Sequence, residues 1–159
     1  MALPCILFPS TVTSSASVIL MPSVAEMQAL GHHKKIRYIT RTTCTACILL
    51  GSLCTTVFYF GGNFAGTILF HNTDAGLYIR TLSFICPFLY TNIALTSILN
   101  GLGKTGTTLV HSVLGILLRI SFVIFAIPVL GIRGYLYGLL LSEILLSLLH
   151  IYALYHMEF

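Results

Sequence analysis

Two charged residues, Arg119 and Glu143, stand in otherwise apolar stretches of the C-terminal half. A charge placed in membrane hydrocarbon costs about 3 kcal/mol or more unless it is paired or hydrated. If these stretches are antiparallel helices joined by the turn Gly131-Ile132-Arg133-Gly134, both charges lie about 12 Å below the same surface. We therefore predict a contact between Arg119 and Glu143, either direct or through water.

Two histidines, His111 and His150, fall at matching depths on the same two stretches, each about two helical turns from the charge on its own stretch. The four residues define a candidate polar seam between the two helices: Arg119, Glu143, His111 and His150. One interpretation is a static pair that fixes helix register, with histidines bonded to nearby backbone. The other is a role in ion or proton coupling, because ionisable residues inside membranes often mark such pathways.

The N-terminal apolar stretch contains many hydroxyl groups and is interrupted by Pro9 and Pro22. Proline frees backbone carbonyls, and hydroxyls can satisfy them or face water, which suits a helix that lines a cavity. Close packing of small residues between helices is an equally good interpretation. The candidate cavity-lining residues are Ser10, Thr13, Ser14 and Ser17.

Two short motifs suggest chemistry that their surroundings do not support. The Cys44-x-x-Cys47 pair has no second pair at metal-ligand spacing, so we interpret the five cysteines as packed thiols. The run Gly103-Lys104-Thr105 resembles the end of a phosphate-binding loop, but Ile98 stands where that loop needs glycine. We predict no catalytic residue, no metal and no cofactor, and the protein is not expected to be an enzyme.

A cluster of basic residues follows the first apolar stretch. At the junction of two membrane segments such a cluster is typical of an anchor to anionic lipid, so we predict contact with membrane lipids and no nucleic-acid partner. The candidate anchor residues are Lys34, Lys35, Arg37 and Arg41.

Composition fixes the environment of these residues. Hydrophobic residues make up 57% of the 159 and charged residues 8%, too little polar surface for a water-soluble domain. A transmembrane helix needs about 20 mostly apolar residues. The sequence predicts a single all-α membrane domain over 1–159, with transmembrane helices at about 3–30, 39–60, 75–100, 105–127 and 134–155.

Basic residues in short loops prefer the cytoplasmic side of a membrane. The basic cluster therefore predicts that the first connection is cytoplasmic, and four further crossings return the C-terminus to the cytoplasm. Asn72-Thr73-Asp74 offers N-cap side chains for the third helix, and Asn100-Gly101-Leu102-Gly103 ends it.

We expect residues 61–70 to form a re-entrant or interfacial turn. The N-terminal stretch has no basic residue before it and is not expected to be a signal peptide.

An ordered set of short motifs resembles one branch of a transporter superfamily. The motifs are Phe8-Pro9 in a Ser/Thr-rich helix, Met21-Pro22-Ser23-Val24-Ala25-Glu26, Ile98-Leu99-Asn100-Gly101-Leu102-Gly103-Lys104 and Gly131-Ile132-Arg133-Gly134. In this order they resemble the stage V sporulation protein B and polysaccharide-exporter branch of the multidrug/oligosaccharidyl-lipid/polysaccharide flippase superfamily. The resemblance implies two six-helix lobes that rock about a central cavity, with this chain corresponding to the second lobe from its second helix onward.

The same resemblance implies a function and partners. It implies a bacterial cytoplasmic-membrane flippase fragment that moves lipid-linked oligosaccharides or peptidoglycan precursors, in the sporulation branch for the spore cortex. The partners would be the lipid-linked sugar substrate and an N-terminal lobe or partner chain. Two departures are the lack of Arg or Lys in the first helix's membrane stretch and a single candidate carboxylate, Glu143, in the last helices. The alternatives are a cation-coupled multidrug exporter and a non-transporting scaffold for envelope assembly.

Overall fold

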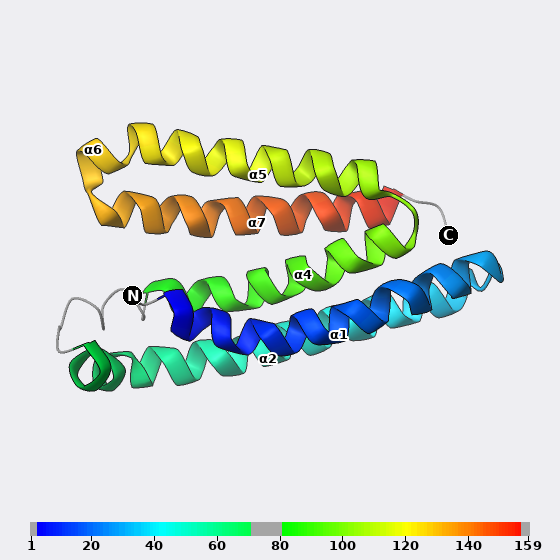
Figure 1. The fold of residues 1–159 in the computed structure, drawn as a ribbon, viewed down its shortest axis with the longest axis horizontal. Coiled ribbons are helices and arrows are strands. Elements are labelled where there is room, and N and C mark those ends of the chain that lie inside the picture. Colours follow the sequence, from blue (N-terminus) through cyan, green and yellow to red (C-terminus); the bar gives the residue numbers. More distant parts are fainter. Residues whose placement is uncertain (1–2, 71–80, 157–159) are drawn as a thin grey trace.

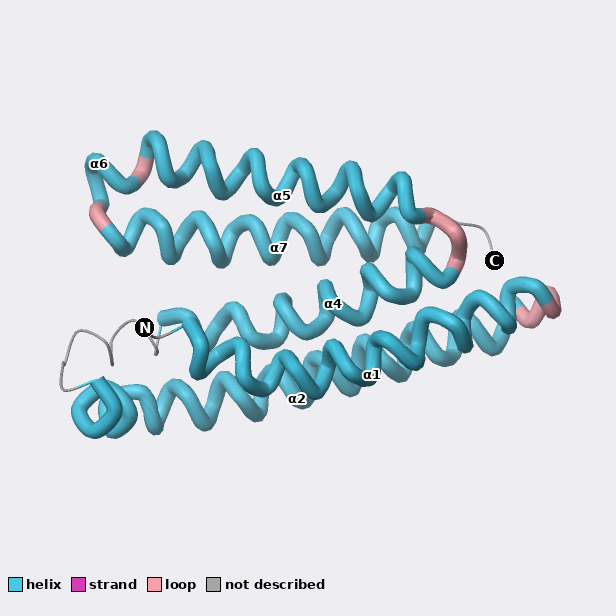
Figure 2. Tube along the Cα trace, in the orientation of Figure 1, coloured by secondary structure: helices cyan, strands magenta, loops and turns pink. Residues whose placement is uncertain are grey.

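Helices make up all the regular structure in residues 3–70 and 81–156, which are the residues that the computed structural model describes. Short loops connect the helices at the two ends of the bundle (Figure 2). The elements are α1 (Leu3–Ala29), α2 (His33–Phe70), the 3₁₀ turn η1 (Ser83–Ile85), α4 (Cys86–Gly101), α5 (Thr105–Phe125), α6 (Ile127–Leu130) and α7 (Ile132–His156).

Four helical stretches in this part of the chain are long and apolar enough to cross a membrane: His33–Gly62, Ser83–Gly101, Thr105–Val129 and Gly134–His156. They confirm the predicted all-α membrane protein. The first expected span is a helix of 27 residues, α1, long enough to cross.

Glycines in the left-handed conformation end α1 and α4 in the same way. Gly31 and Gly103 have φ of 68° and 71°. After α1, the N–H of Gly31 donates to the Gln28 carbonyl oxygen at 3.0 Å and that of His32 to the Met27 carbonyl oxygen at 2.9 Å. This is the Schellman pattern, which repeats after α4, and it satisfies the last helical carbonyls inside the turn. The expected end of the third span near Gly103 is confirmed.

The helix α4 lies at the centre of the bundle (Figure 1). It packs against α1 and α2 on one side and against α7 on the other, while α5 lies outside α7. Two clusters of buried side chains are built around it, one including Tyr90 and Leu136, the other including Val24 and Leu99. Large apolar side chains on α5, such as Leu109 and Ile116, are instead exposed, as expected for a surface that meets lipid.

The helix α2 is longer than the sequence predicts, which corrects two expectations. It begins at His33, so the basic residues lie in its first turns instead of in a loop. It also continues to Phe70, so residues 61–70 are helical where a turn was expected, and the last turns of α2 run at an angle to the rest of the helix (Figure 1). An interfacial position for this segment stays a prediction. Glycine weakens a helix by about 1 kcal/mol per residue but does not end it, and a helix keeps backbone groups bonded where water is scarce. The predicted cap Asn72-Thr73-Asp74 lies outside the described residues.

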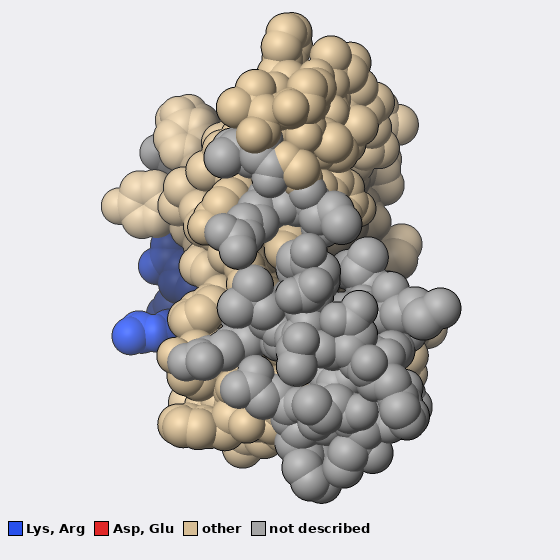
Figure 3. All heavy atoms as spheres, turned by 90° about the vertical axis from the view of Figure 1, so that its left-hand side faces the viewer, with Lys and Arg blue, Asp and Glu red and all other residues tan. Residues whose placement is uncertain are grey.

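Basic residues are distributed unequally between the two ends of the bundle. The turn between α1 and α2, the turn between α4 and α5 and the C-terminal end of α7 lie at one end (Figure 1). The first two of these turns adjoin Lys34 and Lys104. The opposite end faces the viewer in Figure 3, where described Lys and Arg side chains appear only at one edge. Among the residues whose side chains the structure describes, Lys34 and Lys104 thus lie at the end of the bundle that these two turns form.

Candidate functional site

A buried ion pair joins α5 to α7. Arg119 Nη2 donates to Glu143 Oε1, and the exposed fractions of the two side chains are 35% and 8%. Arg119 Nε also donates to Ser142 Oγ at 2.8 Å. The Ser142 hydroxyl in turn donates to the Leu139 carbonyl oxygen at 2.8 Å. The predicted contact between Arg119 and Glu143 is confirmed, and it is direct.

The central helix α4 contributes a third member that the sequence analysis did not single out, Asn92. Its amide Nδ2 donates to Glu143 Oε2 at 2.7 Å and to the Glu143 backbone carbonyl oxygen at 2.9 Å. Each carboxylate oxygen of Glu143 therefore has a partner on a different helix. The sequence does contain a feature that could have identified Asn92. It is an amide inside a charge-free apolar span, and such a side chain needs a polar partner.

The structure also brings together the two histidines of the predicted seam. The ring centroids of His111 on α5 and His150 on α7 are 5.0 Å apart. Both side chains are buried, and His150 is only 2% exposed. Among the described residues, His111 Nδ1 and both ring nitrogens of His150 have no hydrogen-bond partner. The static interpretation expected histidines bonded to backbone, and for His150 the structure contains no such bond.

A groove of about 550 Å³ opens beside these residues, between α1, α4 and α7. Asn92 and Thr96 line it from α4, and Glu143 and His150 from α7. Ser14 and Ser17 line it from α1. The groove thus places two of the hydroxyl residues proposed to line a cavity opposite two residues of the polar seam.

The other two hydroxyl residues of α1 lie elsewhere. Ser10 and Thr13 are buried and are not among the residues that line the groove. With Ser17 and Val24 they form a buried stripe at helical spacing, on the face that α1 turns toward the bundle. The N-terminal helix therefore combines the two arrangements that the sequence left open, small-residue packing and the lining of a polar groove.

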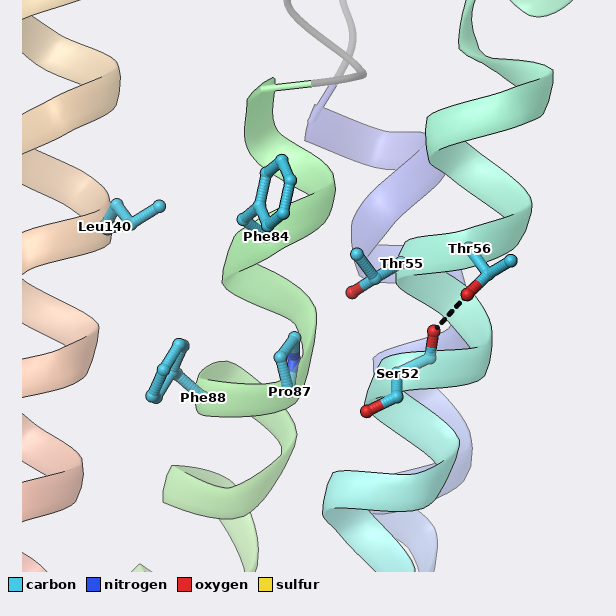
Figure 4. Close-up of a pocket in the computed structure, with 7 residues that line it drawn as sticks. All are labelled: Ser52, Thr55, Thr56, Phe84, Pro87, Phe88 and Leu140. Atoms are coloured by element: carbon cyan, nitrogen blue, oxygen red, sulfur yellow. Dashed lines mark hydrogen bonds between the residues drawn. The ribbon is translucent and has the colours of Figure 1, made fainter.

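A second hollow of about 470 Å³ lies between α2, α4 and α7 (Figure 4). Phe84, Pro87 and Phe88 line one side, and three hydroxyl residues of α2 line the other. These hydroxyls donate to backbone carbonyls: Ser52 to Ile48 at 2.8 Å, Thr56 to Ser52 at 2.9 Å and Thr55 to Ser83 at 2.8 Å. Their donors are used within the protein, so this hollow, like the groove beside Glu143, presents a mostly apolar surface.

The described cysteines and the basic anchor residues lie away from the groove. Cys47 and Cys86 are free thiols in the core cluster around Tyr90, which confirms the prediction that they pack there. The basic anchor residues Lys34, Lys35, Arg37 and Arg41 are exposed, while Ile36 among them is fully buried. The first turns of α2 therefore pack on one face and present cations on another.

The fold and these contacts define a class of protein, an all-α polytopic membrane protein with a groove between its helices that several polar side chains help to line. The chain is 22% identical to stage V sporulation protein B of Bacillus subtilis over 151 residues, which cover 94% of this chain and 29% of that protein. It thus spans less than a third of the length of this relative, and the similarity suggests a distant relationship. No family model matches the chain. No solved structure matches it either.

Proposed function

We propose that this chain is part of a flippase that moves lipid-linked oligosaccharides or peptidoglycan precursors across the bacterial cytoplasmic membrane, in spore formers for the cortex. The observation that carries this proposal is the groove between apolar helices that Asn92, Glu143 and His150 help to line, because a hydrophilic headgroup cannot cross hydrocarbon without polar groups along its path. The similarity to a sporulation protein along 94% of the chain supports it. Transport of this kind is not an enzymatic reaction.

The groove is half of the proposed path. Transporters of this kind alternate access by moving one bundle of helices against another around a central site. We propose that a further lobe, on the same polypeptide or on a partner chain, faces the groove and completes that site. The chain by itself is then expected to bind substrate without moving it.

The proposal is tested in Bacillus subtilis by replacing the matching stretch of stage V sporulation protein B with this chain. We expect the chimera to restore heat-resistant spores to a strain that lacks the native protein, because the groove would then face its complementary lobe. Colony counts after heating measure the result. A chimera that reaches the membrane in normal amount yet yields no more heat-resistant spores than the deletion strain would refute the proposed function.

We also propose that the end of the bundle carrying Gly31 and Gly103 faces the cytoplasm, because Lys34, Lys35, Arg37, Arg41 and Lys104 adjoin it. A fusion of alkaline phosphatase after Gly131 is expected to be active, since that turn would lie outside. Fusions after Gly31 or Gly103 are expected to be inactive. Phosphatase activity normalised to fusion protein measures sidedness, and the reverse pattern would show that the orientation is inverted.

A further inference from the structure

Two residues that line the groove carry buried polar atoms without partners. Both ring nitrogens of His150 and the Oδ1 atom of Asn92 are buried and have no hydrogen-bond partner in the described part of the protein. His150 is 2% exposed and Asn92 is 7% exposed, and both line the groove. Buried polar groups nearly always have partners, so these atoms indicate that water or a ligand completes the site.

The contacts of Glu143 determine which atom Asn92 offers. Its amide nitrogen faces two acceptors, the carboxylate and the backbone carbonyl of Glu143. The amide cannot be reversed without placing its oxygen against both of them. Oδ1 is therefore the Asn92 atom left as an acceptor for a donor from water or from a ligand.

The charges around the groove disfavour an anion. Arg119 is engaged by the carboxylate of Glu143 and by the Ser142 hydroxyl. Among the groove-lining residues that the structure describes, none is a lysine or an arginine. A phosphate has oxygens that only accept at full charge, so it would meet the Asn92 acceptor and the nearby carboxylate without a free cation to balance it.

A hydroxyl-bearing neutral group fits all three observations. A hydroxyl both donates and accepts, and a neutral imidazole offers one donor and one acceptor. Ser14, Ser17 and Thr96 add hydroxyls to the walls between α1 and α4. Along α7, Glu143 and His150 are separated by about 10 Å, so the polar wall is long enough for more than one contact.

We propose that this groove binds the uncharged, hydroxyl-rich part of an amphiphile through Asn92 and His150, and that any phosphate on the same molecule is held outside it. The inference rests on the proposed function, which supplies the amphiphile, and adds which part of it this chain holds. Asn92 and His150 are then residues that determine ligand specificity.

The test offers the purified chain two lipids with the same acyl chains, diglucosyl diacylglycerol and phosphatidylglycerol. A polyoxyethylene detergent is used because sugar detergents would compete for the groove. The basic anchor is first neutralised by Lys34→Gln, Lys35→Gln, Arg37→Gln and Arg41→Gln, so that it cannot hold the anionic lipid. Native mass spectrometry of an equimolar mixture is then expected to show at least about tenfold more glycolipid bound, a difference that corresponds to about 1.4 kcal/mol. Equal binding, or a preference for the anionic lipid, would overturn the inference.

Substitutions assign the binding to the groove. His150→Phe keeps a ring of similar shape and removes both unpartnered nitrogens, so it is expected to fold as well as the parent and to lose about tenfold in glycolipid affinity. His156→Phe is the matched control, because His156 is exposed near the end of the same helix and stacks on Tyr152. Thr96→Val provides a second, smaller change in the groove. Glycolipid binding unaffected by His150→Phe would show that the site lies elsewhere.

The two proposals fail separately. Selective glycolipid binding that depends on His150, together with an inactive sporulation chimera, would contradict the flippase function and leave the binding site standing. An active chimera combined with binding that does not discriminate would leave the function standing and contradict the binding site.

Discussion

Replacing Arg119 by leucine is expected to destabilise the protein by about 3–5 kcal/mol, the cost of leaving a buried charge without its partner. Glu143 is the buried member, with 8% of its side chain exposed, and would keep only Asn92 as a side-chain partner. Reversible unfolding by SDS in bicelles, followed by helical circular dichroism, measures the loss. Arg41→Leu is the control, because Arg41 is exposed and a change there is expected to stay within about 0.5 kcal/mol.

The double substitution Arg119→Leu/Glu143→Leu is expected to recover most of this loss, since two leucines remove both charges from the apolar interface. It also separates the two interpretations of the pair. If the double variant folds and the sporulation chimera that carries it remains active, the pair only fixes the register of α5 and α7. If it folds and the chimera is inactive, the pair takes part in transport. A double variant as unstable as Arg119→Leu would contradict the energetic argument itself.

The contact between Arg119 and Glu143 could be predicted because it depends on local information. The two residues lie on α5 and α7, which only the four-residue helix α6 and its flanking turns separate, so counting from the connection gives their depths. The same reasoning correctly brought His111 near His150. Charge-free runs and glycine turns located most helix boundaries for a similar reason, because both are properties of adjacent residues.

The groove could not be predicted in this way. It depends on α4 lying between α1 and α7, and nothing in the local sequence states which non-consecutive helices are neighbours. The role of Asn92 could not be predicted without that arrangement, since its partner Glu143 is on a helix that is distant along the chain. The length of α2 was missed because apolar composition marks the part of a helix within lipid, and backbone hydrogen bonding extends the helix beyond it.

Where α2 crosses α4, we expect replacement of Gly51 by alanine to destabilise the protein, although alanine favours helix formation more than glycine does. A Cβ atom added at Gly51 would lie 2.3 Å from the Cα atom of Pro87 and 2.8 Å from its backbone nitrogen. Backbone atoms cannot rotate away, so the two helices must separate, and overpacking of this kind costs about 1–3 kcal/mol. The bond from the Thr55 hydroxyl to the Ser83 carbonyl oxygen, 2.8 Å long, lies at the same crossing and would be strained with it.

Gly51→Ala is therefore expected to lower the free energy of unfolding, although alanine is the better helix former. Gly61→Ala is the matched control on the same helix, because a Cβ there meets nothing within 4 Å among the atoms that the structure describes. Without a clash, the gain in helix propensity is expected to raise stability by up to about 1 kcal/mol. Unfolding of both variants in the same bicelles compares the two signs directly. If Gly51→Ala were stabilising as well, α2 and α4 could not approach as closely as this packing requires, and the central position of α4 that forms the groove would be wrong.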